Sequence, residues 1–387
     1  MPEITPYRVD VPDAAIDDLR DRLRRTRWPE PLAGAGWDYG TDAAYLRDLC
    51  AWWADGYDWR AAEAELAAFP HFGMEATCSV GTETVRFLHV RSPHADALPV
   101  VITHGWPGSV YEFHKIIGPL TDPTAHGGDA RDAFHVVCPS ICGYGFSGPN
   151  RNPGFAAPTM GEVNAAIMAA LGYERYGAQG GDWGSLATIG VARADAEHCV
   201  GIHLNMVTPT PGPDQRDDLT DFERSALDRA AWYDRDESGY NRIQSTRPQT
   251  LGFGLTDSPV GLAAWITEKF RSWTDCDGDI ESVVSRDELL TNISIYWFTN
   301  TIASSVRLYR ELRFVDRSWI PRPENPITVP TGAAMFPKEL FRSSRRWMER
   351  AYNVTYWEEF ERGGHFAALE RPDDLVRSMR DFFRPLR

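Results

Sequence analysis

The stretch Tyr-Gly-Ala-Gln-Gly-Gly-Asp-Trp-Gly-Ser at residues 176–185 determines the fold that we expect for this chain. A short strand is expected over Tyr176–Gln179 and a helical run over Ser185–Ala194. Between them, glycines around Asp182 permit the sharp turn of a nucleophile elbow, which exposes one side chain above a sheet. A carboxylate of ordinary pKa is anionic at neutral pH, so it can attack an electrophilic carbon without a base. Taken alone, the same residues could also form a surface turn, because Gly and Asp are common in turns.

On both sides of this turn, short apolar strands alternate with helical runs. Such alternation predicts an α/β fold, with a mostly parallel sheet covered by helices. The expected strands are Val85–Val90, Pro99–Thr103, His135–Pro139, Tyr176–Gln179, Gly201–Asn205, Ile327–Thr331 and Thr355–Phe360. The expected helices among them are Met160–Leu171, Ser185–Ala194 and Pro372–Phe383.

Two further regions are expected to be mainly helical. Residues 1–80 contain three amphipathic or Ala-rich segments after an extended start, which predicts an N-terminal helical region packed on the core. Residues 209–326 lose the strand pattern and become helical and rich in Trp and Tyr, which predicts a cap inserted into a core of residues 81–208 and 327–387. The expected helices are Asp13–Arg25, Asp42–Asp55, Trp59–Phe69, Phe222–Asp234 and Leu289–Arg313.

Composition excludes several classes of function. The formal net charge of −15 disfavours nucleic acid and anionic membrane surfaces as partners, because phosphate binding needs clustered Lys and Arg. The six cysteines are scattered without the spacing of a disulfide framework or a zinc site. Neither a signal peptide nor a long apolar segment is recognisable. We therefore expect a cytoplasmic protein that needs no metal and no organic cofactor.

Two more loops supply candidate site residues. His-Gly-Trp-Pro at residues 104–107 follows a strand, at the end where open α/β sheets bind ligands. The backbone N–H groups of Trp106 and Trp183 are candidates for an oxyanion hole, the second because it follows the elbow Asp. Arg-Gly-Gly-His-Phe at residues 362–366 follows the last strand, and an elbow first with a loop histidine last is the order of the α/β-hydrolases. His365 is therefore the candidate base.

An acid is expected to orient His365 and to stabilise its cationic form. Glu339 is best placed, because it comes just after the strand over residues 327–331. The rivals are Glu358, Glu359, Glu361 and Asp316. Ser147 stands in Gly-Phe-Ser-Gly-Pro, which departs from the serine-hydrolase pattern and precedes no helix, and Ser185 lies past the turn. Both serines are expected to be structural.

Four segments together resemble the microsomal-type epoxide hydrolases, namely residues 104–107, 180–185, 336–340 and 362–367. The resemblance is nearest to soluble actinobacterial members of antibiotic pathways, enediyne biosynthesis among them. It implies an α/β-hydrolase fold with a helical cap, and it implies that Tyr240 and Tyr309 donate protons to the epoxide oxygen. Phenols can hydrogen-bond that oxygen and then protonate the alkoxide. Tyr233 and Tyr296 remain alternatives.

The expected reaction is the opening of an epoxide to a vicinal diol through an ester on Asp182, which a water activated by His365 then hydrolyses. The partners would be a small-molecule epoxide and water, and the N-terminal region is available for a homodimer contact. Two alternatives stay open. A haloalkane dehalogenase would use the same Asp and His, and a non-catalytic protein could keep the fold as a ligand pocket. The sequence does not identify the epoxide or the carbon that is attacked.

Overall fold

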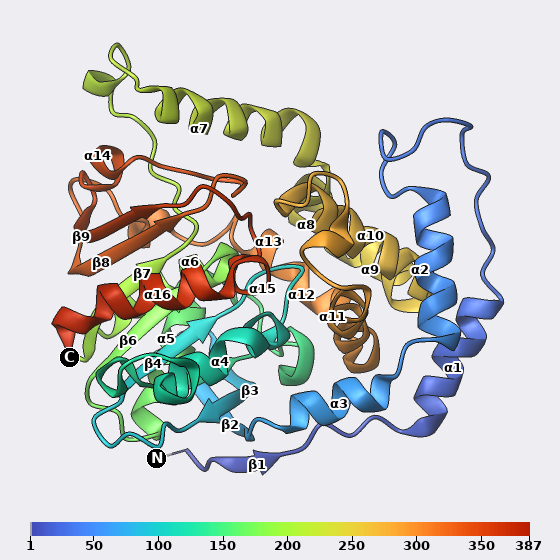
Figure 1. Cartoon of the computed structure of the whole chain (residues 1–387), viewed down its shortest axis with the longest axis horizontal. Coiled ribbons are helices and arrows are strands. Elements are labelled where there is room, and N and C mark those ends of the chain that lie inside the picture. Colours follow the sequence, from blue (N-terminus) through green and yellow to red (C-terminus); the bar gives the residue numbers. More distant parts are fainter. Residues whose placement is uncertain (1) are drawn as a thin grey trace.

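One nine-stranded sheet organises the computed structural model, which describes residues 2–387 (Figure 1). The order is β1-β2-β3-β5-β4-β6-β7-β8-β9, antiparallel from β1 to β5 and parallel from β5 to β9. This arrangement confirms the α/β class. The strands are β1 (Thr5–Tyr7), β2 (His71–Cys78), β3 (Gly81–Val90), β4 (Leu98–Thr103), β5 (Phe134–Pro139), β6 (Tyr176–Gly180), β7 (Cys199–Leu204), β8 (Ile327–Met335) and β9 (Tyr352–Glu359).

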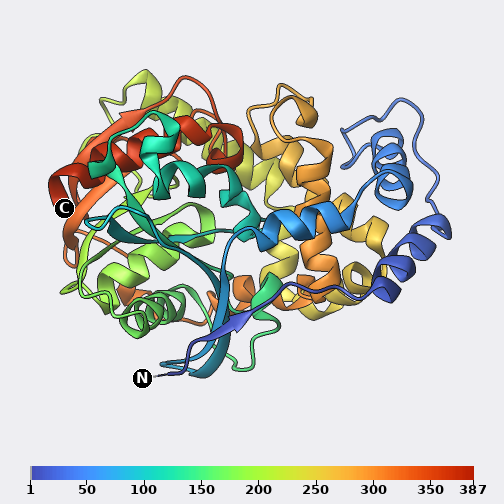
Figure 2. The ribbon, with the colours of Figure 1, turned by 60° about the horizontal axis from the view of Figure 1, so that its bottom comes forward.

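Helices cover both faces of the parallel part of the sheet, which is why its central strands are apolar throughout. Every residue of β5 is buried, as expected for a strand enclosed on two sides. Helices α4 and α16 lie on one face, and α5 and α6 lie on the other (Figures 1 and 2). The helices of the core are α4 (His114–Thr121), α5 (Ala157–Ala170), α6 (Asp182–Ala194), α14 (Arg345–Met348), α15 (Ala367–Glu370) and α16 (Pro372–Phe383). Helix α4 was not expected from the sequence.

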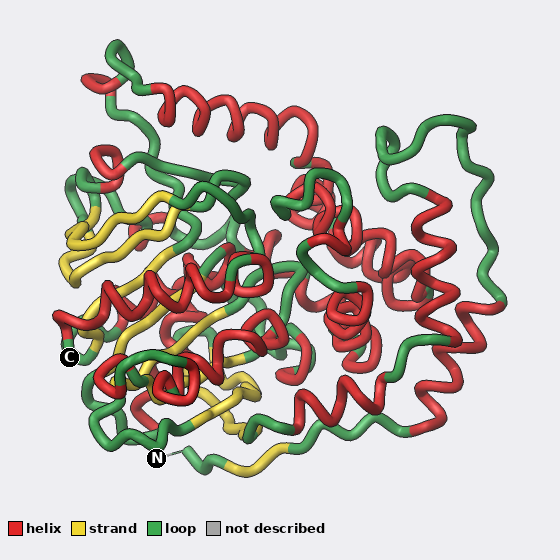
Figure 3. Tube along the Cα trace, viewed as in Figure 1, coloured by secondary structure: helices red, strands yellow, loops and turns green. Residues whose placement is uncertain are grey.

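The chain between β7 and β8 consists of helices and loops that lie beside the sheet (Figure 3). The single run expected over Leu289–Arg313 is wrong, because the helix ends at Asn300 and two short helices follow. Asn300 has a φ of 54°, the left-handed conformation that terminates helices. The helices of this segment are α7 (Asp221–Trp232), α8 (Gly239–Thr246), α9 (Pro248–Asp257), α10 (Pro259–Trp273), α11 (Arg286–Thr299), α12 (Ile302–Ser305) and α13 (Arg307–Glu311).

The N-terminal region differs from the expected helical region in two ways. Strands β1 and β2 extend the sheet, because residues 71–78 form a hairpin with β3. The helices α1 (Asp13–Arg24) and α2 (Ala43–Asp55) contact α10 rather than the helices of the core, and α3 (Trp59–Ala67) contacts α11. In Figure 2 the segment between β7 and β8 therefore lies between the sheet and these N-terminal helices. Trp53 fixes this packing, since its indole N–H donates to Ser294 Oγ at 2.9 Å.

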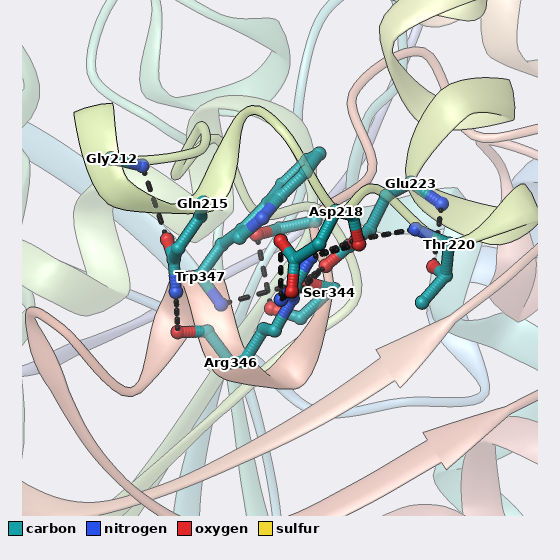
Figure 4. Close-up of polar contacts among 9 residues, drawn as sticks. Gly212, Gln215, Asp218, Thr220, Glu223, Ser344, Arg346 and Trp347 are labelled. Carbon is teal, nitrogen blue, oxygen red and sulfur yellow. Dashed lines mark hydrogen bonds and ion pairs between the residues drawn. The ribbon is translucent and has the colours of Figure 1, made fainter.

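A partly buried ion pair connects the start of α7 to the core (Figure 4). Arg346, at the start of α14, contacts Glu223 through Nε at 2.6 Å and also pairs with Asp218 at 3.0 Å. The hydroxyl of Ser344 donates to Glu223 at 2.6 Å, and the backbone N–H of Thr220 donates to the same carboxylate. The Glu223 side chain is 1% exposed, so its charge depends on these partners.

Within residues 2–387, no helix has the length and apolar character that crossing a bilayer requires.

Candidate active site

The turn between β6 and α6 presents Asp182 at the carboxyl end of the sheet. Asp182 has a φ of 50°, which is rare for a residue with a side chain and marks a strained turn. Its neighbours leave no space for side chains. A Cβ at Gly184 would lie 1.8 Å from the carbonyl oxygen of Thr103, and a Cβ at Gly180 would lie 2.2 Å from Gly184. The glycines therefore allow the sharp turn that the sequence predicts.

The loop after β4 brings a backbone donor to this carboxylate. The N–H of Trp106 donates to Asp182 Oδ1 at 2.7 Å. A Cβ at Gly105 would lie 2.3 Å from the Cβ of Asp182, so the close approach of the two loops requires glycine there. Trp183 occupies the first turn of α6, where backbone N–H groups have no partner within the helix. Both expected oxyanion-hole residues thus adjoin Asp182, and the structure shows the hydrogen bond for Trp106.

His365 lies between two carboxylates. Its Nδ1 is 2.6 Å from Glu339 Oε1, and its Nε2 is 3.5 Å from Asp182 Oδ2. The imidazole and Glu339 are both buried. Burial on its own would lower the pKa of His365, but the charges of Glu339 and Asp182 outweigh it and raise that pKa well above its ordinary value. The structure therefore joins the three residues that the sequence assigned to a triad.

The loop that carries His365 is fastened to the end of α10. The backbone N–H of His365 donates to the carbonyl oxygen of Trp273 at 2.9 Å, and the N–H of Gly363 donates to Asp275 at 2.9 Å. Gly363 has a φ of 112°, and a Cβ at Gly364 would lie 2.4 Å from the Trp273 oxygen. Gly363 is needed for this left-handed backbone, and Gly364 is needed because the loop contacts the end of α10 directly.

Tyr240 on α8 and Tyr309 on α13 lie above the Asp182 turn. The ring of Tyr240 stacks on Trp106 at 5.2 Å between centroids, and the ring of Tyr309 packs edge-on against Trp183 at 4.8 Å. The two tyrosine rings are 5.8 Å apart, and both residues are buried. Burial raises the pKa of each phenol well above 10, so both are protonated near neutral pH.

The two alternative tyrosines have different surroundings. Tyr296 donates its hydroxyl to the carbonyl oxygen of Gly108 at 2.6 Å, so its proton has a structural acceptor. Tyr233 instead adjoins the pair, with its hydroxyl 3.0 Å from that of Tyr240. Among the described residues, the hydroxyl of Tyr309 has no hydrogen-bond partner.

Three of the four rival acids and both serines have partners elsewhere, and the fourth acid, Glu361, is exposed. Glu358 pairs with Arg377, Glu359 accepts from Trp357, and Asp316 accepts from Ser318. Ser147 donates to the carbonyl oxygen of Ser140, and Ser185 donates to that of Met206. Within residues 2–387, the described side chains form no cluster of three or more potential metal ligands.

Glu112 is a residue of the site that the sequence reasoning missed. It lies in the 3₁₀ helix Val110–Phe113 and lines a cavity of about 20 Å³ together with Asp182, His365 and Gln179. That volume suits about one water molecule. The Oε1 atom of Glu112 is buried without a hydrogen-bond partner, and burial raises the pKa of Glu112 to about 8. The sequence signal that could have identified Glu112 is that it is a single acidic residue among apolar residues, shortly after residues 104–107.

The sheet, the elbow and the order of the three loops define the protein as an α/β-hydrolase. Two family models match the sequence, "Epoxide hydrolase N terminus" over residues 4–113 and "alpha/beta hydrolase fold" over residues 99–234. A Stigmatella aurantiaca protein that carries the name of an epoxide hydrolase is 46% identical, over 99% of this chain and 86% of that protein. Epoxide hydrolase 1 of Sus scrofa is 38% identical, over 98% of this chain and 88% of that protein.

A solved structure agrees with these similarities. Aspergillus niger epoxide hydrolase has a TM-score of 0.86 and 30% sequence identity, with 100% of this chain and 97% of that chain covered. The chain therefore belongs to the epoxide hydrolase family of enzymes.

Proposed function

We propose that this enzyme opens an epoxide to a vicinal diol in two chemical steps. Asp182 attacks one ring carbon and forms an ester, while Tyr240 and Tyr309 hold and protonate the ring oxygen. A water activated by His365 then attacks the carbonyl carbon of the ester, and the diol leaves. The observation that carries this proposal is that two buried phenols pack on Trp106 and Trp183, which lie beside Asp182, and that the carboxylate of Asp182 already accepts the Trp106 N–H at 2.7 Å.

The first step depends on Asp182 being an oriented anion. The hydrogen bond from Trp106 fixes one carboxylate oxygen, while the side chain of Asp182 is still 16% exposed. Ring opening transfers an electron pair to the epoxide oxygen, and a hydrogen bond from a phenol stabilises this developing charge. The same backbone donor would stabilise the tetrahedral oxyanion when the ester is hydrolysed.

The second step depends on a change in the pKa of His365. In the free enzyme, Asp182 and Glu339 hold that pKa above its ordinary value. Ester formation neutralises Asp182 and removes one of these two charges. The pKa of His365 then falls, so the imidazolium releases its proton to solvent and a neutral imidazole is available to deprotonate the water. The imidazole takes a proton back from solvent when the charge of Asp182 is restored. Glu339 remains and stabilises the cation that forms.

A single turnover in oxygen-18 water tests the proposal. Because the water attacks the carbonyl carbon, the heavy oxygen should first appear in Asp182, where peptide mass spectrometry can locate it. Heavy oxygen found only in the diol would contradict an ester intermediate. In His365→Gln, mixing with an epoxide should add the mass of the epoxide to Asp182 and leave it there. Release of halide from a haloalkane without diol formation from any epoxide would favour the dehalogenase alternative.

A further inference from the structure

A third tyrosine lies directly behind one of the two expected proton donors. Tyr233 begins a short π-helical turn, Tyr233–Glu237, between α7 and α8, and such turns are frequent at functional sites. Its ring meets that of Tyr240 edge-on at 6.4 Å, and the two hydroxyl oxygens are 3.0 Å apart. Tyr233 is 8% exposed, so the pair is shielded from solvent.

The next residue in this chain of contacts gives the hydrogen bonds a direction. The side-chain nitrogen of Asn241 donates to the hydroxyl oxygen of Tyr233 at 3.4 Å, and an amide NH₂ can only donate. If Tyr233 in turn donates to Tyr240, the hydrogen of Tyr240 points into the site. An epoxide oxygen bound there accepts this hydrogen, and every member of the chain then has a partner. The opposite direction would leave the hydrogen of Tyr233 without an acceptor among the described residues.

Tyr309 has no such support. Its hydroxyl is buried without a partner, and its neighbours in the site are the rings of Trp183, Trp106 and Tyr240. A phenolate formed at Tyr309 has only the hydroxyl of Tyr240 as a neighbouring phenol donor, whereas one at Tyr240 also accepts the hydrogen of Tyr233 from behind. The two phenols are chemically unequal although both lie above the Asp182 turn.

We propose that Tyr233 is a positioning residue that donates to Tyr240 and makes Tyr240, rather than Tyr309, the phenol that gives up its proton. This inference rests on the proposed function. As the bond from Asp182 to carbon forms, the carbon–oxygen bond of the epoxide breaks and its electron pair takes the proton of Tyr240. Tyr309 only holds the oxygen. The two hydrogens of the hydrolytic water balance the cycle, since one goes to the alkoxide released from Asp182 and the other restores Tyr240.

Double-mutant cycles test this assignment with styrene oxide as the probe. The single-turnover rate of ester formation is measured for Tyr233→Phe, for Tyr240→Phe, for Tyr309→Phe and for the two doubles that contain Tyr233→Phe. Tyr233→Phe removes a hydrogen bond to the oxygen of Tyr240, which becomes charged as the ring opens. This substitution should therefore slow ring opening about 10- to 100-fold. Ester hydrolysis should be unchanged. Tyr233→Phe should not slow ester formation further when Tyr240 is already Phe. In the Tyr309→Phe background it should slow ester formation by the same factor as in the native enzyme.

Two further variants separate this role from a structural one. Tyr57→Phe is the matched control, because it removes a buried hydroxyl that is bonded to Thr291 outside the site, and it should leave ester formation unchanged. Asn241→Asp replaces the donor by an acceptor, so it should draw the hydrogen of Tyr233 away and slow ring opening while the Tyr233 hydroxyl stays in place.

The outcomes distinguish this inference from the proposed function. The assignment would be overturned if Tyr233→Phe slowed ring opening by the same factor in the Tyr240→Phe background as in the native enzyme, but had no effect in the Tyr309→Phe background. It would also be overturned if Tyr233→Phe had no effect in any background. Both results leave the ester on Asp182 intact. If native enzyme opened styrene oxide without any ester, the proposed function itself would fail.

Discussion

At the scale of single residues, the pKa of His365 offers the most direct test of the proposed second step. The imidazole ring touches Asp182 and Glu339, and both carboxylates raise its pKa. In Asp182→Asn one of these charges is lost, as it is in the ester. We expect the pKa of His365 to fall, because one of the two charges that favour its cationic form is gone. Nuclear magnetic resonance titration of the histidine ring checks this, and an unchanged pKa would contradict the idea that ester formation releases the base.

A second prediction at this scale concerns the role of Glu112 in ester hydrolysis. Because burial raises its pKa to about 8, the carboxyl is mostly neutral at pH 7 and can hydrogen-bond a water in the adjoining cavity. Glu112→Gln keeps the shape but loses the acidic hydroxyl, so we expect ester hydrolysis to slow about 10-fold while ester formation is retained. Quenched-flow mass spectrometry would show ester accumulating. Equal slowing of both steps would indicate a purely structural role.

The same substitution should change how stability depends on pH. A carboxyl whose folded pKa lies above its unfolded value of 4.5 costs stability as pH rises between 4.5 and about 8, because the charged form is disfavoured in the folded state. Gln cannot ionise, so the decline over this window should be smaller in Glu112→Gln.

The site residues differ in how well the sequence specified them. Asp182, His365 and Glu339 each follow a recognisable strand, so chain order and turn chemistry predicted them as candidates, and the structure places their side chains together. Tyr240 and Tyr309 lie on helices whose spacing carries no chemical signal, and a family resemblance was needed to select two of 14 tyrosines. The link from Tyr233 to Tyr240 depends on a π-helical turn, which hydrophobic periodicity does not reveal.

At the scale of elements, the attachment of α7 to α14 makes a prediction about acid stability. Arg346 is the main cause that lowers the pKa of Glu223 from 4.5 to about 2. A lowered carboxyl pKa stabilises the fold above pH 4.5, and this contribution is lost as pH falls from 4.5 toward 2. Glu223→Gln should therefore lower the free energy of unfolding by about 1–2 kcal/mol at pH 7. This figure is reduced because Arg346 is partly exposed. The free energy of unfolding of the variant should also decline less steeply as the pH falls.

Urea unfolding at several pH values measures this contribution. Glu349→Gln is the matched control, because Glu349 pairs with Arg345 on the exposed side of the same helix and should contribute almost nothing. Equal effects of the two substitutions would show that the ion pair of Glu223 does not stabilise the start of α7.

Elements were predicted well where periodicity and packing agree. Helix α16 begins and ends at the expected residues, because its apolar residues repeat at helical spacing and only one face is buried. The errors arose where a local feature decided the outcome. Asn300 ends α11 although the helical pattern of the sequence continues beyond it. Strand β2 was missed because it is stabilised by pairing with another segment, β3, and not by a pattern within residues 71–78. Neither is visible in a window of single-sequence periodicity.

At the scale of the whole molecule, one hydrophobic core runs through the sheet, the helical segment between β7 and β8, and the N-terminal helices. Trp53 on α2 belongs to this core and is 1% exposed. The N-terminal helices contact α10 and α11, and α10 in turn contacts the loop of His365 through Trp273. The stability of the N-terminal region and the geometry of the site should therefore be coupled.

Calorimetry with Trp53→Ala tests this coupling. Loss of the indole leaves a cavity between α2 and α11, so we expect about 3–5 kcal/mol of destabilisation in a single unfolding transition for the whole chain. Trp52→Ala is the matched control, because Trp52 lies on the same helix but is 41% exposed, and it should cost far less. A separate early transition confined to the N-terminal helices, with the main transition unchanged, would contradict one cooperative core. Hydrogen exchange resolved by peptide would then show early exchange in residues 13–67 only, because the remaining helices would keep the protection of the native enzyme.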